Sequence, residues 1–341
     1  CGILLELGGG MDIADLLAVC VARGASDMHL SAGVEPLLRI DGDLQRCELP
    51  SVSAQCVLEL IHSMMTASQR EAFETTLEAD FSYTVPELGR FRVNAFRQQH
   101  GPAAVLRRIG ATVPSLASLG LEQVLSPLFN VPHGLILITG ATGSGKTTTL
   151  AALIDHLNST RQQHILTIED PIEFVHTSRR CLINQREVHR DTHGFANALR
   201  SALREDPDVI VLGEMRDLDS IRLALTAAET GHLVFATLHT PSAAKTIDRI
   251  VDVFAAEEKA MVRAMLSESL QAVVSQTLLK KKGGGRVAAH EIMLGTPAIR
   301  NLIRENKVAQ MASVIQTGAA VGMQTLDMSV KRLQERGIID L

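Results

Sequence analysis

The segment Gly140–Thr147 reads GATGSGKT, the complete GxxxxGK[ST] pattern of a phosphate-binding loop. The apolar run Gly134–Thr139 precedes it and predicts a buried strand, whereas Thr148–Asp155 follows it with the apolar spacing of a helix. A strand, a glycine-rich turn and a helix in this order define an α/β arrangement in which the first backbone N–H groups of the helix face a phosphate. The sequence therefore predicts a nucleoside triphosphate site.

Each residue of this loop has a predicted place at the nucleotide. Lys146 is expected to reach the β- and γ-phosphates and to act in catalysis, and the Thr147 hydroxyl is expected to bind Mg²⁺. The predicted nucleotide-binding residues are Gly140, Ala141, Thr142, Gly143, Ser144, Gly145, Lys146, Thr147 and Thr148.

Carboxylates follow two further apolar runs that are typical of central parallel strands. Glu214 comes after Val209–Leu212, with glycine at the position where related sites usually carry a first acid, and Ile165–Ile168 leads into Glu169, Asp170 and Glu173. Because parallel strands present their carboxyl ends to the ligand, we expect these acids to cluster near the γ-phosphate. The alternative for each is a solvated carboxylate at a strand end or helix cap.

The predicted roles of these acids differ. Glu214 is assigned to Mg²⁺ and its water shell, Glu169 to the metal as well, and Glu173 to the attacking water, with the exchange of Glu214 and Glu173 left open. His239 closes the run Leu233–Leu238 on the same side and is expected to sense or polarise the γ-phosphate. His232, at the opposite end of that run, fits a structural histidine equally well.

Length and composition bound the remaining possibilities. A chain of 341 residues with 46% hydrophobic residues favours two domains. A net charge of −5, no Trp and one Tyr argue against a nucleic-acid partner. Five scattered cysteines indicate neither a zinc site nor a disulfide framework, and no apolar run reaches the roughly 18 residues of a transmembrane segment.

Changes in pattern along the chain predict four segments. Residues 1–10 are interpreted as an extension or remnant outside the fold, 11–110 as an α+β domain, 111–120 as a linker, and 121–341 as an α/β core that becomes mainly helical from about residue 256.

Long motifs then resemble a known family. The segments GATGSGKTTT, TIEDPIEF, LREDPDVIVLGEMRD and TGHLVFATLHT resemble, in this order, the Walker A, Asp-box, Walker B and His-box motifs of the type II/IV secretion ATPases. Ala298–Glu305, AIRNLIRE, is similar to a segment of the pilus-retraction members of that family. The likeness covers residues 11 to about 335.

This resemblance implies a RecA-like ATPase core, a PAS-like N-terminal domain, and a homohexameric ring that binds ATP and Mg²⁺ between subunits. It also implies a cytoplasmic motor, peripheral at the inner membrane, that powers type IV pilus retraction (twitching motility) on a platform protein, with a paralogous retraction ATPase as a further partner.

Two arginines of the N-terminal domain fit such a ring. In the predicted strand Gly89–Phe96, Arg90, Arg92 and Asn94 share one face, and Arg107 lies on the predicted partner strand. We expect Arg92 and Arg107 to act catalytically on phosphates bound by a neighbouring subunit. The alternative is a solvated sheet face.

Other functions of the same core remain as alternatives. Pilus-extension and type II secretion ATPases usually carry a long additional N-terminal domain and a tetra-cysteine zinc insertion, and this sequence has neither. A nucleic-acid translocase is disfavoured by charge and composition. A ring that does not hydrolyse ATP is disfavoured by intact Lys146, Thr147 and Glu214.

Overall fold

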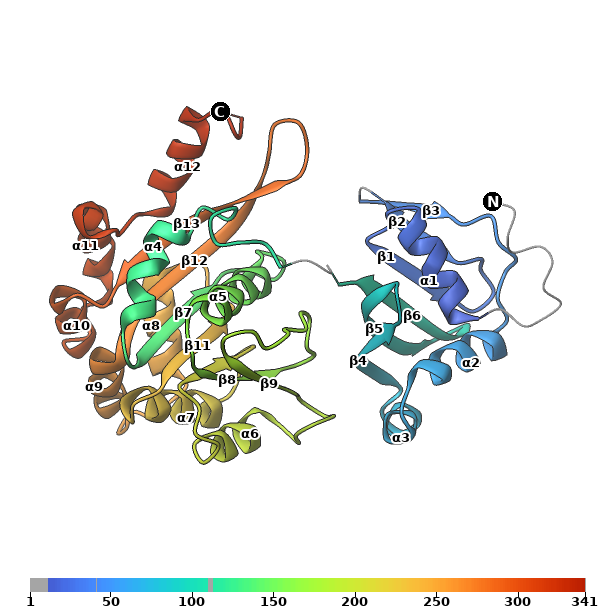
Figure 1. Ribbon diagram of the computed structural model, residues 1–341, viewed down its shortest axis with the longest axis horizontal. Coiled ribbons are helices and arrows are strands. Elements are labelled where there is room, and N and C mark those ends of the chain that lie inside the picture. Colours follow the sequence, from blue (N-terminus) through green and yellow to red (C-terminus); the bar gives the residue numbers. More distant parts are fainter. Residues whose placement is uncertain (1–11, 41, 110–112, 341) are drawn as a thin grey trace. The chain divides into compact units, whose positions relative to one another are not determined.

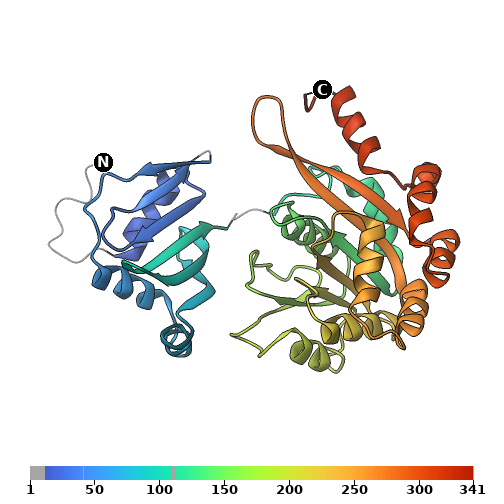
Figure 2. The same cartoon turned by 180° about the vertical axis from the view of Figure 1, so that it is seen from behind.

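The computed structural model describes residues 12–40, 42–109 and 113–340, which divide into two compact units (Figures 1 and 2). The division falls between Thr112 and Val113. Leu116, inside the predicted linker, is buried in a core cluster of the second unit, so the part of that segment after Thr112 belongs to the second unit. The predicted extension 1–10 lies outside the described residues.

The first unit is a six-stranded sheet with its helices packed on the apolar side. The strand order is β3-β2-β1-β6-β5-β4, and every neighbouring pair is antiparallel. Its elements are α1 (Ile13–Ala22), β1 (Asp27–Ser31), β2 (Leu37–Ile40), β3 (Asp43–Arg46), α2 (Ala54–Met64), α3 (Ala67–Thr76), β4 (Glu78–Val85), β5 (Gly89–Gln98) and β6 (Gly101–Arg108).

Buried and more exposed side chains alternate along β5, so that one face of the sheet packs against the core of the first unit. Phe91, Val93 and Ala95 are fully buried, and they pack in one cluster with side chains of α1 and α2. Arg92 and Asn94 lie on the other face, as the period-two pattern predicts. The first unit is therefore an α+β fold, as predicted, whereas the PAS-like assignment stays a prediction.

The second unit is a seven-stranded sheet, β13-β12-β7-β11-β10-β8-β9, whose neighbouring strands are parallel except for β12 and β13. Its elements are α4 (Glu122–Leu125), η1 (Ser126–Asn130), β7 (Gly134–Thr139), α5 (Lys146–Thr160), β8 (His164–Glu169), β9 (Leu182–Glu187), α6 (Phe195–Ala202), β10 (Val209–Leu212), α7 (Leu218–Glu229), β11 (Leu233–Leu238), α8 (Ala243–Asp252), α9 (Lys259–Ser269), β12 (Leu270–Lys280), β13 (Arg286–Leu294), α10 (Pro297–Arg304), η2 (Val308–Gln310), α11 (Met311–Thr317), η3 (Gly318–Val321) and α12 (Leu326–Glu335).

The apolar runs are central strands because both faces of this sheet are covered (Figure 1). In β7, Leu135 and Leu137 pack in the cluster that includes α6 to α9, whereas Ile136 and Ile138 pack on the opposite side with α5. Parallel strands buried on both faces read as continuous hydrophobic sequence. The four strands predicted at β7, β8, β10 and β11 are thereby confirmed.

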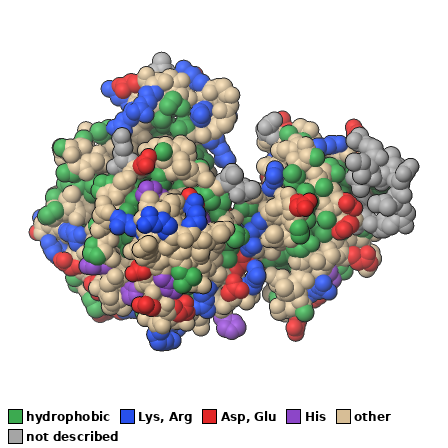
Figure 3. All heavy atoms as spheres, in the orientation of Figure 1, with side chains coloured by type: hydrophobic (Ala, Val, Ile, Leu, Met, Phe, Trp, Pro, Cys, Tyr) green, Lys and Arg blue, Asp and Glu red, His purple; other side chains and the backbone are tan. Residues whose placement is uncertain are grey.

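The prediction of a mainly helical segment from about residue 256 is wrong in its first part. After α9, the long strands β12 and β13 extend the sheet at the β7 edge, and helices resume at Pro297. A buried apolar run such as Leu270–Leu279 has no periodicity that separates a strand from a helix, and here the available edge of β7 decides the outcome. Lys281–Gly285 is the turn of this hairpin. The hairpin and α12 both reach the top of Figure 1, and Lys and Arg side chains gather at the top of the second unit in Figure 3.

Helix α10 starts with residue types that favour a helix N-terminus. Thr296 caps it, Pro297 occupies its first turn, and Ile299 is fully buried. No helix of the described residues is long and apolar enough to cross a bilayer.

Arg300 of α10 makes its hydrogen bonds to backbone carbonyl groups of neighbouring segments. Its guanidinium donates hydrogen bonds to the carbonyl oxygens of Gly295 (2.7 Å), Ser267 (2.9 Å), Leu270 (3.1 Å) and Glu268. It therefore caps the last carbonyls of α9, which the helix itself leaves without donors. Arg304 remains at the surface in an ion pair with Glu268 at 2.8 Å.

Candidate functional site

The loop between β7 and α5 has a backbone that glycine makes possible. Gly140 has φ +143° and Gly145 has φ +89°, values that side-chain-bearing residues rarely adopt. A Cβ on Gly140 would collide with the carbonyl oxygen of Gln276 and with Ser144. No side chain in the described structure caps the start of α5, so its first N–H groups face the loop. This is the arrangement that binds phosphate at a helix start.

Lys146 lies folded into the loop. Its side chain is buried, and its ammonium donates to the carbonyl oxygens of Gly140 and Ala141, both at 3.0 Å. Burial lowers the pKa of Lys146, and the charges of Glu214 and Glu173 oppose that shift. The Lys146 ammonium is therefore near enough to Glu214 and Glu173 to interact with their charges.

His239 connects the loop to the acid after β10. Its Nδ1 lies 3.3 Å from Thr142 Oγ1 and 3.4 Å from Lys146 Nζ, and its Nε2 lies 3.3 Å from Glu214 Oε1. Thr142, Lys146, Glu214 and His239 come from the ends of three adjacent parallel strands, β7, β11 and β10. The structure thus brings together a cation, a carboxylate and an imidazole that the sequence predicted at one sheet edge.

Arg216 also belongs to this site, and sequence analysis missed it. Its Nε lies 2.8 Å from Glu214 Oε2, and its NH1 lies 4.0 Å from Asp170 Oδ2. The available signal was its position two residues after Glu214 in the segment GEMRD. Arg216 holds Glu214 from the side opposite to His239, which fixes the carboxylate between two nitrogen groups.

Glu169 lies at the end of β8 and is buried. It accepts hydrogen bonds from Thr167 Oγ1 at 2.6 Å and Gln185 Nε2 at 3.1 Å. Burial raises the pKa of Glu169 to about 7, and the charge of Glu173 adds to that rise. Ionisation of Glu169 near neutral pH is thus costly unless a cation lies close to it.

The glycine that replaces the usual first acid has a local reason. A Cβ on Gly213 would lie 3.3 Å from the Cα atom of Glu169, and the Gly213 N–H donates to Ile168 O at 2.8 Å. A side chain at this position would therefore lie in tight contact with the backbone of β8. With glycine at this position, the predicted acids that follow β10 and β8 in the described structure are Glu214, Glu169, Asp170 and Glu173.

His232 stands apart from this group. It precedes β11 at the end opposite to His239, and its Nδ1 lies 3.1 Å from the carbonyl oxygen of Ala227 in α7. The structural interpretation of His232 fits this contact.

The described residues contain no cluster of three or more His, Cys, Asp or Glu side chains arranged to hold a metal ion. The predicted Mg²⁺ ligands Thr147, Glu214 and Glu169 lie in the first turn of α5, after β10 and at the end of β8. Mg²⁺ commonly uses one or two protein oxygens together with water and substrate phosphates. The oxygen chemistry of these three residues fits that mode.

The two predicted arginine donors are neighbours in the first unit. Arg92 and Arg107 are directly opposed in the pairing of β5 and β6. Arg92 forms a bidentate ion pair with Asp80, with Nε–Oδ1 at 3.0 Å and NH2–Oδ2 at 2.6 Å. Arg107 Nε lies 2.8 Å from Asp27 Oδ1, although its side chain is 69% exposed. Both guanidinium groups are thus oriented by carboxylates of their own unit.

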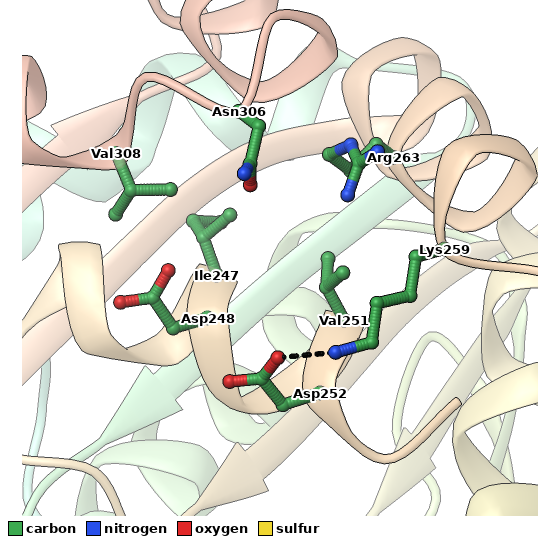
Figure 4. A pocket seen from close by; sticks show the side chains of 8 residues that line it. All are labelled: Ile247, Asp248, Val251, Asp252, Lys259, Arg263, Asn306 and Val308. Atoms are coloured by element: carbon green, nitrogen blue, oxygen red, sulfur yellow. Dashed lines mark hydrogen bonds and ion pairs between the residues drawn. The ribbon is translucent and has the colours of Figure 1, made fainter. Parts of the chain in front are cut away.

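A small pocket elsewhere in the second unit has no share in this site. It lies between α8, α9 and the segment after α10 (Figure 4). An ion pair between Lys259 and Asp252, at 2.7 Å, crosses one side of it. None of its lining residues comes from the phosphate-binding loop: Ile247, Asp248, Val251, Asp252, Lys259, Arg263, Asn306 and Val308.

Comparisons with known proteins define the class. The family model described as "Type II/IV secretion system protein" matches residues 11–335. The "Type IV pilus retractation ATPase PilT" of Pseudomonas aeruginosa is 66% identical over 329 residues, 96% of each chain. A "Twitching motility protein" of Neisseria gonorrhoeae is 59% identical, covering 99% of this chain and 94% of its own.

A solved structure agrees. The crystal structure of the pilus retraction motor PilT with bound ADP superposes with a TM-score of 0.89 at 47% identity, covering 97% of this chain and 95% of the other. This protein belongs to the type II/IV secretion system protein family. The predicted α/β fold, the resemblance to pilus-retraction ATPases and the prediction of an ATPase are confirmed.

Proposed function

We propose that this protein is the ATP-hydrolysing motor of type IV pilus retraction. The observation that carries the proposal is the joining of Lys146 in the phosphate loop to Glu214 through His239. Nucleotide chemistry needs a cation at the phosphates and an acid at the metal or water, and these groups lie at one sheet edge. The names of the pilus-retraction relatives supply the process that the hydrolysis drives.

Each site residue has a proposed role. Lys146 neutralises the β- and γ-phosphates, and Thr147 and Glu214 hold Mg²⁺. Glu173 orients the attacking water, with the exchange of roles between Glu173 and Glu214 still open. Glu169 supports the metal from β8, where a nearby cation would favour its ionised form. His239 senses the γ-phosphate, and Arg92 and Arg107 complete the site from a neighbouring subunit.

The proposed assembly is a homohexamer in which each first unit, assigned as PAS-like, faces the nucleotide of the next subunit. Such a ring would act in the cytoplasm, peripherally at the inner-membrane base of the pilus. A membrane platform protein and a paralogous retraction ATPase are its proposed partners. Two neighbouring arginines on a unit without a phosphate loop support this arrangement, because a guanidinium group binds phosphate in a bidentate manner.

A cellular experiment separates retraction from extension. In a bacterium that carries this protein, deletion of its gene should abolish twitching and leave cells with more surface pili than the parent. A plasmid copy should restore both properties, and a Lys146→Ala copy should restore neither. Absence of surface pili after deletion would instead identify an extension ATPase.

A mixing experiment examines the proposed ring. The double variant Arg92→Ala/Arg107→Ala and the variant Lys146→Ala should each be nearly inactive as ATPases. Equal mixing should restore activity, because about a quarter of the head-to-tail interfaces in random rings carry all three residues intact. Native mass spectrometry should report the mixed hexamers. Arg46→Ala is the matched control, because Arg46 is also ion-paired in the first unit, to Glu35 at 2.7 Å.

Mixed hexamers that stay inactive would contradict delivery across the interface. Arg92 and Arg107 would then be structural partners of Asp80 and Asp27 in their own unit.

A further inference from the structure

Gln276 contacts the phosphate-binding loop Gly140–Thr147, although it has no role in the proposed chemistry of the site. It is a residue of β12, its side chain is 2% exposed, and both ends of its amide are used. Its Nε2 donates to the carbonyl oxygen of Ser144 at 2.6 Å, and its Oε1 accepts from Thr149 Oγ1 at 2.9 Å. Ser144 is in the loop and Thr149 is in the first turns of α5. One side chain therefore bridges the loop and the helix that follows it.

Gln276 also lies against the first and last glycines of the loop, with its backbone at Gly140 and its side chain at Gly145. The carbonyl oxygen of Gln276 occupies the space that a Cβ of Gly140 would need, and its Nε2 lies 3.2 Å from a Cβ placed on Gly145. The register explains this closeness, because Ser275 pairs in parallel with Thr139, the residue just before the loop. The two ends of the loop are thus close to Gln276 of β12.

The strand that carries Gln276 is firmly held. Pairing between β12 and β13 is continuous from Ala272 to Lys280, and β7 pairs with its other edge. His290 is opposite Gln276 on β13 and is buried, and burial lowers its pKa to about 4. His290 is therefore uncharged near neutral pH and does not compete for the Gln276 amide as a cation.

The bond to Ser144 has a directional consequence at the phosphate. The peptide between Ser144 and Gly145 is planar and trans, so its C=O and N–H point in opposite directions. A Ser144 carbonyl held toward the Gln276 side chain turns the N–H of Gly145 away from that side chain. Loops of this type bind phosphate through such N–H groups.

We propose that Gln276 is a positioning residue that sets the orientation of the Ser144–Gly145 peptide and thereby the affinity of the loop for nucleotide phosphates. It acts through Ser144 and Thr149 and touches no reacting atom. The inference rests on the proposed assignment of Gly140–Thr148 to nucleotide binding, and it adds the element that orders this loop.

The test compares two substitutions of similar size. Gln276→Met removes both bonds, and Gln276→Glu keeps an acceptor for Thr149 but loses the donor to Ser144. Each should raise the Kd for MgADP and the KM for ATP about tenfold, because a buried carbonyl loses its partner. Their kcat values should fall by a smaller factor, since binding to the loop is shared by the ground and transition states. Calorimetry and steady-state kinetics measure both.

Gln271→Met is the matched control. Gln271 is on the same strand and also donates to a backbone carbonyl, that of His133 at 3.1 Å, at the start of β7. Its substitution should leave the MgADP affinity within twofold of the parent. A double-mutant cycle with Thr149→Val should be non-additive, because Gln276 and Thr149 share one hydrogen bond.

Gln276→Met and Gln276→Glu proteins with parental melting temperatures and MgADP affinities within twofold of the parent would overturn the inference. If Gln276→Met does not fold, the same criterion applies to Gln276→Glu and to Thr149→Val. Lys146→Ala separates this result from the underlying assignment. Unchanged MgADP binding by Lys146→Ala would refute the site itself, whereas loss there with unchanged binding by the Gln276 variants would refute only the role of Gln276.

Discussion

Lys146→Ala is expected to lower the rate of ATP hydrolysis by at least roughly 100- to 1000-fold. A positioned charge at the transferring phosphate is a large part of catalysis in phosphoryl transfer, and its removal leaves the developing charge without a partner. The structure strengthens this expectation, because Lys146 is buried and already held at the loop by the carbonyls of Gly140 and Ala141. Phosphate release at saturating MgATP measures the effect.

Lys245→Ala is the control for this prediction. Lys245 lies on α8 with a largely exposed side chain, so its loss should leave hydrolysis near the parental rate. Near-parental hydrolysis by Lys146→Ala would instead remove Gly140–Thr148 from consideration as the catalytic loop.

Glu214→Gln and Glu173→Gln are each expected to reduce kcat by roughly 100-fold while nucleotide remains bound. The substitutions preserve shape and remove a charge. Glu214 is the carboxylate held between His239 and Arg216, and both acids act electrostatically on Lys146. If the two serve one assembly of metal and water, the double variant should lose far less than the product of the single losses.

Single-turnover kinetics measures the loss in the chemical step, and MgADP binding shows whether each variant still holds nucleotide. Glu258→Gln is a suitable control, because Glu258 is an ion-paired glutamate of the second unit, 2.7 Å from Arg222. Losses that multiply would place the two acids in independent roles. A defect in only one variant would identify the acid that matters and end the dual assignment.

Local sequence was sufficient to predict the core of the second unit. The loop motif can be recognised from its own residues. The four apolar runs can be recognised in the same way, because a parallel strand that is buried on both faces is apolar throughout. The rule that parallel strands share a ligand-side edge then predicts that Glu214 and His239 lie close together.

Contacts between distant segments could not be predicted in this way. Gln276 is 127 residues from Thr149 in sequence, and the apolar run that carries it has no periodicity that separates a strand from a helix. The contact between Arg216 and Glu214 depends on the direction of the arginine side chain, which the sequence does not give. The pairing of Arg92 with Asp80 required the register of β4 and β5, which alternation alone does not give.

The capping contact made by Arg300 changes how mutations in Ala298–Glu305 should be interpreted. This arginine ties α10 to the junction of α9 and β12, and β12 runs on to the phosphate loop. The segment Ala298–Glu305 and the phosphate loop are therefore both in contact with β12. A loss of twitching caused by substitutions in the segment is not by itself evidence of a partner-binding surface, because the same substitutions can remove contacts to the strand that carries Gln276.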